Sequence, residues 1–304
     1  MKVGVIQVDG KWANLALMKI STYHKNKSDS VHLNPPYADK VYVSAIFAKN
    51  RAKALGLAQF HRSLGAEVVT GGSGIDLKTE LPLTIENLIP DYELYGLDYS
   101  MGFTSRGCPN NCEPCIVPRK EGMIREAPTN WIIHDRAKLL DNNFLASPKW
   151  KEKLKFFIDA DIEICASQGL DIRRINDENS KLLTEVKSRN NQWTKRCYYF
   201  AFDYPELEPI IKEKLLILKN HGITPSQQLY YVLCGFNTTH EQDLHRVQWL
   251  HAQGCMAFVM KYHNHDDWLN RLANWCNGRY YKVVPVFNDF NRKQFNQTKK
   301  VLAK

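Results

Sequence analysis

The chain has 304 residues, of which 44% are hydrophobic and 24% charged, with a formal net charge of +9. This composition excludes a disordered chain, and no apolar run reaches the roughly 20 residues needed to cross a bilayer. The positive charge favours polyanions such as RNA as partners, although solvated lysines on an ordinary surface account for it equally well. We expect no membrane partner. Because the first apolar stretch is too short for a signal peptide, we expect a cytoplasmic protein.

Residues 1–97 show alternating strand and helix patterns, and we interpret them as one small domain. Short β-branched runs predict strands at 2–8, 30–34, 40–47 and 66–72, and helical spacing of apolar residues predicts helices at 13–25 and 51–65. Gly65 is the expected stop of the second helix. Strands that alternate with helices indicate a doubly wound parallel sheet with helices packed on it.

A second series of elements fills residues 98–290. The predicted strands are 98–105, 137–144, 162–170, 196–203, 228–236 and 255–262, and the clearest helices, 205–222 and 239–254, both close on glycine. The strands recur about every 30 residues, which is the length of a βα unit. Six units predict a partial (βα)6 barrel, with its chemistry at the carboxyl ends of the strands. Residues 291–304 read as a basic C-terminal tail.

Three of the eight cysteines stand close together, as Cys108-x3-Cys112-x2-Cys115 directly after the first of these strands. In a reducing compartment such a cluster indicates metal or redox chemistry rather than disulfides. A structural zinc site needs four ligands, which a distant histidine such as His134 would have to complete. A four-iron cluster held by three cysteines instead keeps one iron open for a ligand.

The triplet, its place after the first strand and the six-strand count resemble the radical SAM superfamily. The resemblance implies an α/β protein in which a doubly wound parallel domain precedes a partial (βα)6 radical SAM barrel. It implies that Cys108, Cys112 and Cys115 bind a [4Fe–4S] cluster whose open iron chelates S-adenosylmethionine. One residue departs from the pattern, since Pro114 stands where the superfamily usually has an aromatic residue against the adenine.

The resemblance also implies an enzyme that cleaves S-adenosylmethionine reductively and uses the 5′-deoxyadenosyl radical on a substrate that the sequence does not identify. An electron donor such as flavodoxin or ferredoxin would be its partner. The alternative is a protein that binds an iron–sulfur cluster or zinc without catalysis, for example as a redox sensor. No catalytic residue is assigned beyond the cofactor ligands.

Polar residues at strand ends are the candidates for binding the cofactor. Asp141 and Asn143 lie in a segment that resembles the "DDNF"-like strand end of several radical SAM families, and Arg173 would suit the methionyl carboxylate. Gln168 and Asp203 complete the predicted set. Each of these residues would equally suit a helix cap or a turn, which Asp and Asn often form.

The N-terminal domain resembles a trimmed cobalamin-binding domain, in which the glycines near Gly72 would let the backbone approach the cobalamin tail. The D-x-H-x-x-G motif that supplies a cobalt ligand is absent from residues 1–97, so cobalamin is possible but not favoured. The competing interpretation is that Gly71, Gly72 and Gly74 form a tight turn.

Two further groups are interpreted as structural. Arg119, Lys120 and Glu121 after the triplet could line the site, but we expect them to be exposed loop charges. The five single cysteines are predicted to be buried small apolar residues and not part of a second cluster.

Overall fold

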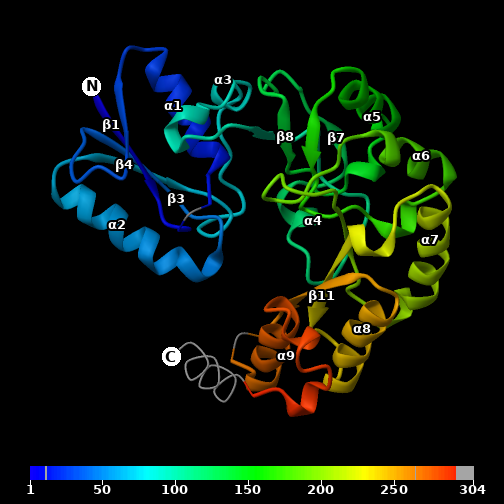
Figure 1. Cartoon of the computed structure of the whole chain (residues 1–304). Helices are drawn as coiled ribbons and strands as arrows, with labels where there is room; N and C mark the ends of the chain where they lie inside the picture. Colours follow the sequence, from blue (N-terminus) through cyan, green and yellow to red (C-terminus); the bar gives the residue numbers. More distant parts are fainter. Residues whose placement is uncertain (11, 264, 292–304) are drawn as a thin grey trace, which may run out of the picture. The chain divides into compact units, whose positions relative to one another are not determined.

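The computed structural model describes residues 1–10, 12–263 and 265–291 (Figure 1) and contains two compact units, residues 1–142 and 143–304. The second unit begins inside the predicted barrel segment 98–290. The predicted boundary near residue 97 stays a prediction. Except for its first residue, the predicted tail 291–304 lies outside the described residues.

The first unit opens with a four-stranded parallel sheet. Its elements are β1 (Lys2–Gln7), α1 (Leu15–Lys25), β2 (Ser30–Leu33), β3 (Lys40–Ser44), α2 (Arg51–Ser63) and β4 (Glu67–Gly71). The strand order is β2-β1-β3-β4, and every neighbouring pair is parallel. The strands and helices expected in residues 1–97 are thus confirmed, as is the parallel α/β class.

Alternating side chains of β1 give this sheet two apolar faces. Val5 packs with Leu17 of α1, whereas its neighbour Ile6 packs with Ala54 and Ala58 of α2. Successive residues of a strand point to opposite faces, so a continuous apolar run buries both. The result is a three-layer arrangement with one helix on each side of the sheet (Figure 1).

The rest of the first unit contains short elements around the cysteine triplet. They are α3 (Leu83–Glu86), β5 (Ser100–Gly102), β6 (Ser105–Arg106), α4 (Val117–Lys120), β7 (Arg125–Glu126) and β8 (Arg136–Leu139). Strands β5 and β8 pair in parallel, and β6 pairs with β7 in antiparallel fashion. The β6–β7 ladder therefore brackets the segment that carries the cysteines.

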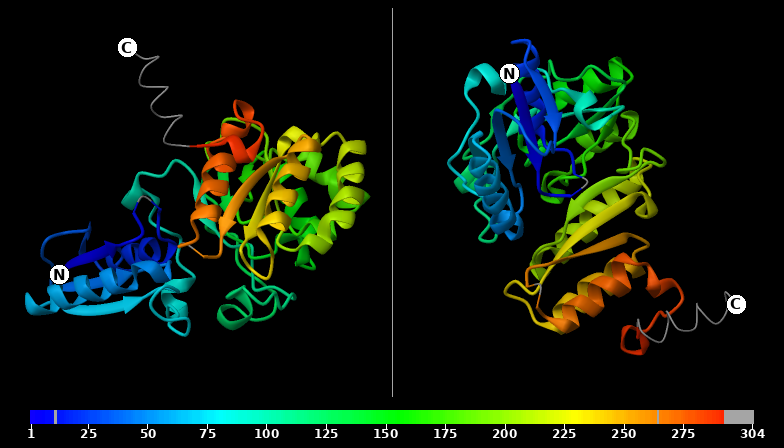
Figure 2. Two further views of the ribbon diagram at one scale, coloured as in Figure 1. Left: turned by 90° about the horizontal axis from the view of Figure 1, so that it is seen from below. Right: turned by 90° about the vertical axis from the view of Figure 1, so that its left-hand side faces the viewer.

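The second unit contains α5 (Trp150–Asp159), β9 (Glu163–Cys165), α6 (Asp177–Glu185), β10 (Tyr198–Ala201), α7 (Glu208–Asn220), β11 (Gln228–Cys234), α8 (His240–Ala252), β12 (Met256–Lys261) and α9 (Asp267–Asn277). Strands β10, β11 and β12 form a parallel sheet, and Figure 2 shows helices beside these strands. Gly222 and Gly254 follow α7 and α8 in the left-handed conformation, as expected for helix stops.

Each of the six predicted barrel segments contains a strand in the structure, namely β5, β8, β9, β10, β11 and β12. The parallel α/β class is therefore confirmed for both units. No closed barrel is formed by the described residues, so the (βα)6 arrangement itself stays a prediction. Within the same described part, no helix has the length and apolar character needed to span a membrane.

The glycines after β4 pack against the chain's own backbone. A Cβ atom on Gly72 would lie 2.3 Å from the carbonyl oxygen of Ala45, and one on Gly74 would lie 2.6 Å from that of Phe47. The amide of Gly74 also donates to Ala45. This contact between the ends of β3 and β4 accounts for the glycines as a tight turn, which is the interpretation that competes with cobalamin binding.

We expect Gly72→Ala to lower the free energy of unfolding of the first unit by about 3 kcal/mol, because strain at φ +93° adds to the clash with Ala45. Gly65→Ala is the matched control. Its φ is +87° but nothing lies within 4 Å of the added carbon, so the expected cost is only about 1 kcal/mol. Urea unfolding followed by circular dichroism measures both, and equal costs would contradict the packing argument.

Candidate functional site

The three cysteines of the triplet lie in a loop of residues 107–122, here called the Cys loop, and each is half-buried. Two of the sulfurs accept backbone hydrogen bonds. The amide of Asn110 donates to Cys108 Sγ over 3.5 Å, and that of Val117 donates to Cys115 Sγ over 3.4 Å. Such N–H groups stabilise thiolate ligands and tune clusters bound to them.

The two ends of the Cys loop are joined. The amide of Cys108 donates to the carbonyl of Gly122 over 3.1 Å, next to the β6–β7 ladder. Gly107 has φ +83°, and a Cβ there would lie 2.3 Å from the carbonyl oxygen of Met123. Only glycine suits this position, because it needs both the left-handed conformation and the close approach.

A bidentate ion pair also holds the two ends of the Cys loop together. Arg106 donates from Nε and Nη2 to the two carboxylate oxygens of Glu121, both at 2.8 Å, and from Nη1 to Glu86 at 2.8 Å. Burial alone would raise the pKa of Glu121, but the hydrogen bonds and charge of Arg106, helped by Arg125, hold it below its usual value. The Glu121 carboxylate is therefore ionised at neutral pH and bound to its partner.

The structure corrects the prediction that all three charges after the triplet are exposed. The side chain of Glu121 is only 8% exposed because it pairs with the arginine before the loop. Lys120 is half-buried and donates to the carbonyls of Leu77 and Thr79, whereas Arg119 is exposed as expected. These contacts could not be predicted from local sequence patterns, because the partners lie 15 to 43 residues away along the chain.

The end of β8 holds the segment that leads into the Cys loop. Asp141 is 2% exposed, and its carboxylate accepts four hydrogen bonds of 2.6–2.9 Å from the amides and hydroxyls of Thr104 and Ser105. The next residue, Asn142, accepts from the amide of Gly107 over 2.9 Å. Asp141 thus positions the loop, and its predicted contact with a cofactor stays a prediction.

His134, the candidate fourth zinc ligand, lies at the amino end of the β5–β8 pair, whereas the Cys loop follows its carboxyl end. Two of the three thiols accept N–H···S bonds, whereas His134 bonds to Ser100 Oγ at 3.0 Å and packs edge-on against Tyr92. In the part of the chain that the structure describes, no three His, Cys, Asp or Glu side chains are arranged to hold a metal ion. The thiols would therefore have to move together on binding one.

Three of the predicted cofactor residues in the second unit follow β8, β9 and β10 in the chain. The amide of Asn143 donates to Asp171 over 3.1 Å, and Arg173 binds the same carboxylate through Nε and Nη2 at 2.7 and 2.9 Å. Asp203 follows β10. We call Asn143, Asp171, Arg173 and Asp203 the strand-end cluster.

Asp203 of this cluster lies close to a buried arginine. Burial raises the pKa of the Asp203 carboxyl, while the charges of Arg246 and Arg173 act in the opposite direction. Arg246 is fully buried and donates to the carbonyls of Phe202 and Leu233, at 2.6 and 2.7 Å, and to Asp243. It thereby ties the ends of β10 and β11 together.

Arg246 and Asp243 are residues that our sequence analysis did not single out. Their spacing of three on an amphipathic helix was the available signal. Gln168, the last predicted cofactor residue, lies exposed in the turn after β9, and its role stays a prediction.

The five single cysteines are buried, as predicted: Cys165, Cys197, Cys234, Cys255 and Cys276. Burial raises the pKa of the Cys197 thiol to about 11 and that of Cys255 to about 12. At neutral pH these thiols stay protonated, so they are poor metal ligands. All eight cysteines are described, and none forms a disulfide.

The sequence matches no protein-family model, and no curated protein is similar to it at a significant level.

The difference in burial predicts how the thiols react. In the native protein without metal, Ellman's reagent should modify three thiols rapidly and the other five only after denaturation. Cys112→Ala should lower the rapid count to two, whereas Cys197→Ala should leave it at three. Rapid modification of four or more thiols in the native wild type would contradict the assignment.

The ion pair between Arg106 and Glu121 at the ends of the Cys loop predicts that the stability of the protein depends on pH. Since the pKa of Glu121 is lowered in the folded state, its stabilisation is present above the usual carboxyl pKa and is lost as the pH falls through the folded-state value. Glu121→Gln should lower the free energy of unfolding by about 2 kcal/mol at pH 7. The difference from wild type should shrink in acid.

Urea titrations at a series of pH values measure this difference. The control is Glu93→Gln, whose side chain is 93% exposed and should change stability by less than about 0.5 kcal/mol. A Glu121→Gln deficit that is the same at every pH would show that packing, rather than charge, makes the contribution.

Proposed function

We propose that this chain is a radical SAM enzyme whose Cys108, Cys112 and Cys115 hold a [4Fe–4S] cluster. The observation that carries the proposal is the Cys-x3-Cys-x2-Cys spacing in a loop whose backbone amides donate to two of the sulfurs. Once bound, the cluster would supply the electron that cleaves S-adenosylmethionine and yields a 5′-deoxyadenosyl radical. The substrate that this radical would attack is not part of the proposal.

The residues around the triplet have a positioning function in this proposal. The Arg106–Glu121 pair and the bond between Cys108 and Gly122 fix the two ends of the Cys loop. Asp141 fixes the segment before it. Because the ends are already ordered, drawing three thiols together costs only the entropy of the short segment between them.

The strand-end cluster supplies groups suited to the amino-acid part of S-adenosylmethionine. Asp171 holds the guanidinium of Arg173 in one orientation, and a planar guanidinium is well suited to a ligand carboxylate. Asn143 and Asp203 offer an amide and a carboxylate for the ammonium group. We include Asn143, Arg173, Asp203, Asp141 and Gln168 in the proposal as cofactor-binding residues.

The proposal requires a one-electron donor, and flavodoxin or ferredoxin would suit the reaction in the cytoplasm. Cobalamin is not needed for the proposed cleavage. The glycines that suggested it are engaged by the turn between β3 and β4.

Anaerobic reconstitution tests the proposal. Purified protein is incubated with ferrous iron and sulfide, then with dithionite and S-adenosylmethionine, and 5′-deoxyadenosine is quantified. We expect wild-type protein to bind about four irons and to form 5′-deoxyadenosine. Cys112→Ala should lose both the cluster absorbance and the product. Cys197→Ala, which removes a buried thiol outside the loop, should retain both.

Two results would contradict the proposal in different ways. A full cluster without any 5′-deoxyadenosine would favour a non-catalytic iron–sulfur protein, such as a redox sensor. Tight zinc binding that needs the three cysteines, with no uptake of iron and sulfide, would favour a structural zinc site.

A further inference from the structure

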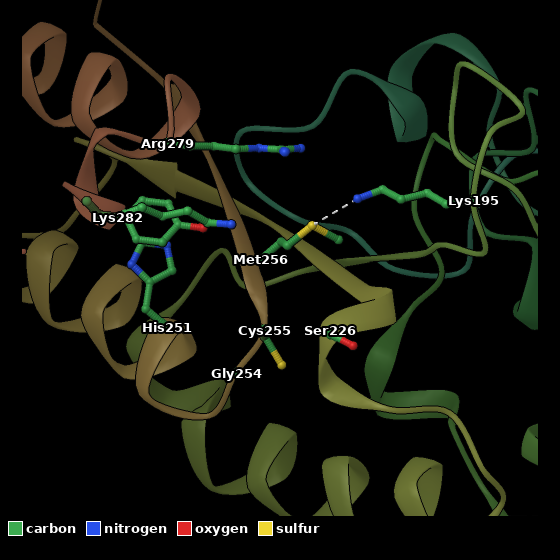
Figure 3. A pocket seen from close by; sticks show the side chains of 9 residues that line it. Lys195, Ser226, His251, Gly254, Cys255, Met256, Arg279 and Lys282 are labelled. Atoms are coloured by element: carbon green, nitrogen blue, oxygen red, sulfur yellow. Dashed lines mark hydrogen bonds between the residues drawn. The ribbon is translucent and has the colours of Figure 1, made fainter.

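A cavity of about 300 Å³ opens at the amino end of the β10–β12 sheet (Figure 3). Ser226 lies just before β11, and Cys255 just before β12. The strand-end cluster lies at the carboxyl ends of strands, so the cavity belongs to a different site. In parallel α/β folds, residues at the amino ends of the strands usually contribute only to stability. A cavity lined by charged side chains at that end is therefore a candidate for a separate binding site.

The polar lining of this cavity is cationic. Lys195, Arg279 and Lys282 line it, and among the described residues neither Asp nor Glu does. His251 adds no charge at neutral pH, because burial lowers its pKa to about 4. The site therefore carries three positive charges.

Two of these cations approach the same space. Figure 3 shows the side chains of Arg279 and Lys195 extending toward each other from opposite sides, above Met256, and Lys195 Nζ lies 3.9 Å from Met256 Sδ. Like charges that converge repel each other, and an anion between them converts the repulsion into attraction. The arrangement thus favours an anionic ligand over an empty site.

The backbone at Arg279 has a conformation that suits the end of a helix. Arg279 has φ +58°, in the left-handed region, where a residue other than glycine costs about 1 kcal/mol. The preceding Gly278 cannot be larger, since a Cβ there would lie 2.5 Å from the ring of Tyr280. The amide of Arg279 donates to the carbonyl of Cys276, so the left-handed conformation ends α9 at the cavity that the Arg279 side chain lines.

Part of the remaining wall is formed by two stacked rings and a methionine. His251 stacks on Tyr281 with ring centroids 3.8 Å apart, and the half-buried Met256 lies beside the cations. A cavity of this volume is at the lower end of the range for small-molecule sites. The size suits one nucleotide-sized molecule rather than an extended polymer.

We propose that this cavity binds a small phosphorylated ligand of about the size of a nucleoside monophosphate. Its phosphate lies between Lys195 and Arg279, with Lys282 nearby, and its organic part packs against Met256 and Tyr281. Arginine is well suited to bidentate contact with phosphate oxygens. This site is independent of the proposed radical chemistry and stands whether or not a cluster binds.

Arg279→Gly tests the assignment without endangering the fold, because glycine suits φ +58° better than arginine does. Calorimetric titration of the full chain with AMP should show binding that this variant weakens about tenfold or more. Lys212→Ala removes one exposed cation from α7 and serves as the control of equal charge. It should stay within about twofold of wild type, and thermal unfolding should show Arg279→Gly to be at least as stable as wild type.

A comparison of three probes tests whether the phosphate group is what the cavity recognises. AMP should bind, inorganic phosphate should compete with it, and adenosine without phosphate should bind far more weakly. The proposal is overturned if adenosine binds as well as AMP, if neither AMP nor phosphate binds at millimolar concentration, or if Arg279→Gly and Lys212→Ala behave alike. It is also overturned if a single-stranded RNA oligomer binds much more tightly than AMP and depends on Arg279, since that would indicate a nucleic-acid surface.

Discussion

The buried carboxylate of Asp141 is the constraint on which the candidate site depends. It accepts hydrogen bonds from both the amides and the hydroxyls of Thr104 and Ser105, and Asn142 adds a bond from Gly107. These bonds attach the start of the Cys loop to the end of a parallel strand. Without them several buried donors would lose their partners, which is costly in a protein interior.

The Cys loop thus combines ordered ends with a middle part that carries the thiols. Arg106 and Glu121 close it from the side, and the amide of Cys108 closes it from within. A loop with ordered ends suits metal binding, because the ordered ends lower the entropy cost of bringing the ligands together.

The parallel sheet of the second unit has two different edges. At the carboxyl ends of its strands, Arg246 joins β10 to β11 and lies near the carboxylate of Asp203. At the amino ends, Lys195 and Arg279 line a cavity together with Met256 and Tyr281. Because all strands of a parallel sheet point the same way, loops from distant parts of the chain gather at each edge, and each edge can carry its own site.

The sequence by itself determined the local elements and the types of donor. Periodicity and β-branched runs identified the strands and helices, and the spacing of the cysteines placed three thiols in one loop, because these properties depend on near neighbours. Only the tertiary structure decided that Asp141 binds Thr104, that Glu121 is buried against Arg106, and that Arg279 and Lys195 line one cavity. Those partners lie 15 to 84 residues apart, and strand register and loop packing, which no local pattern encodes, bring them together.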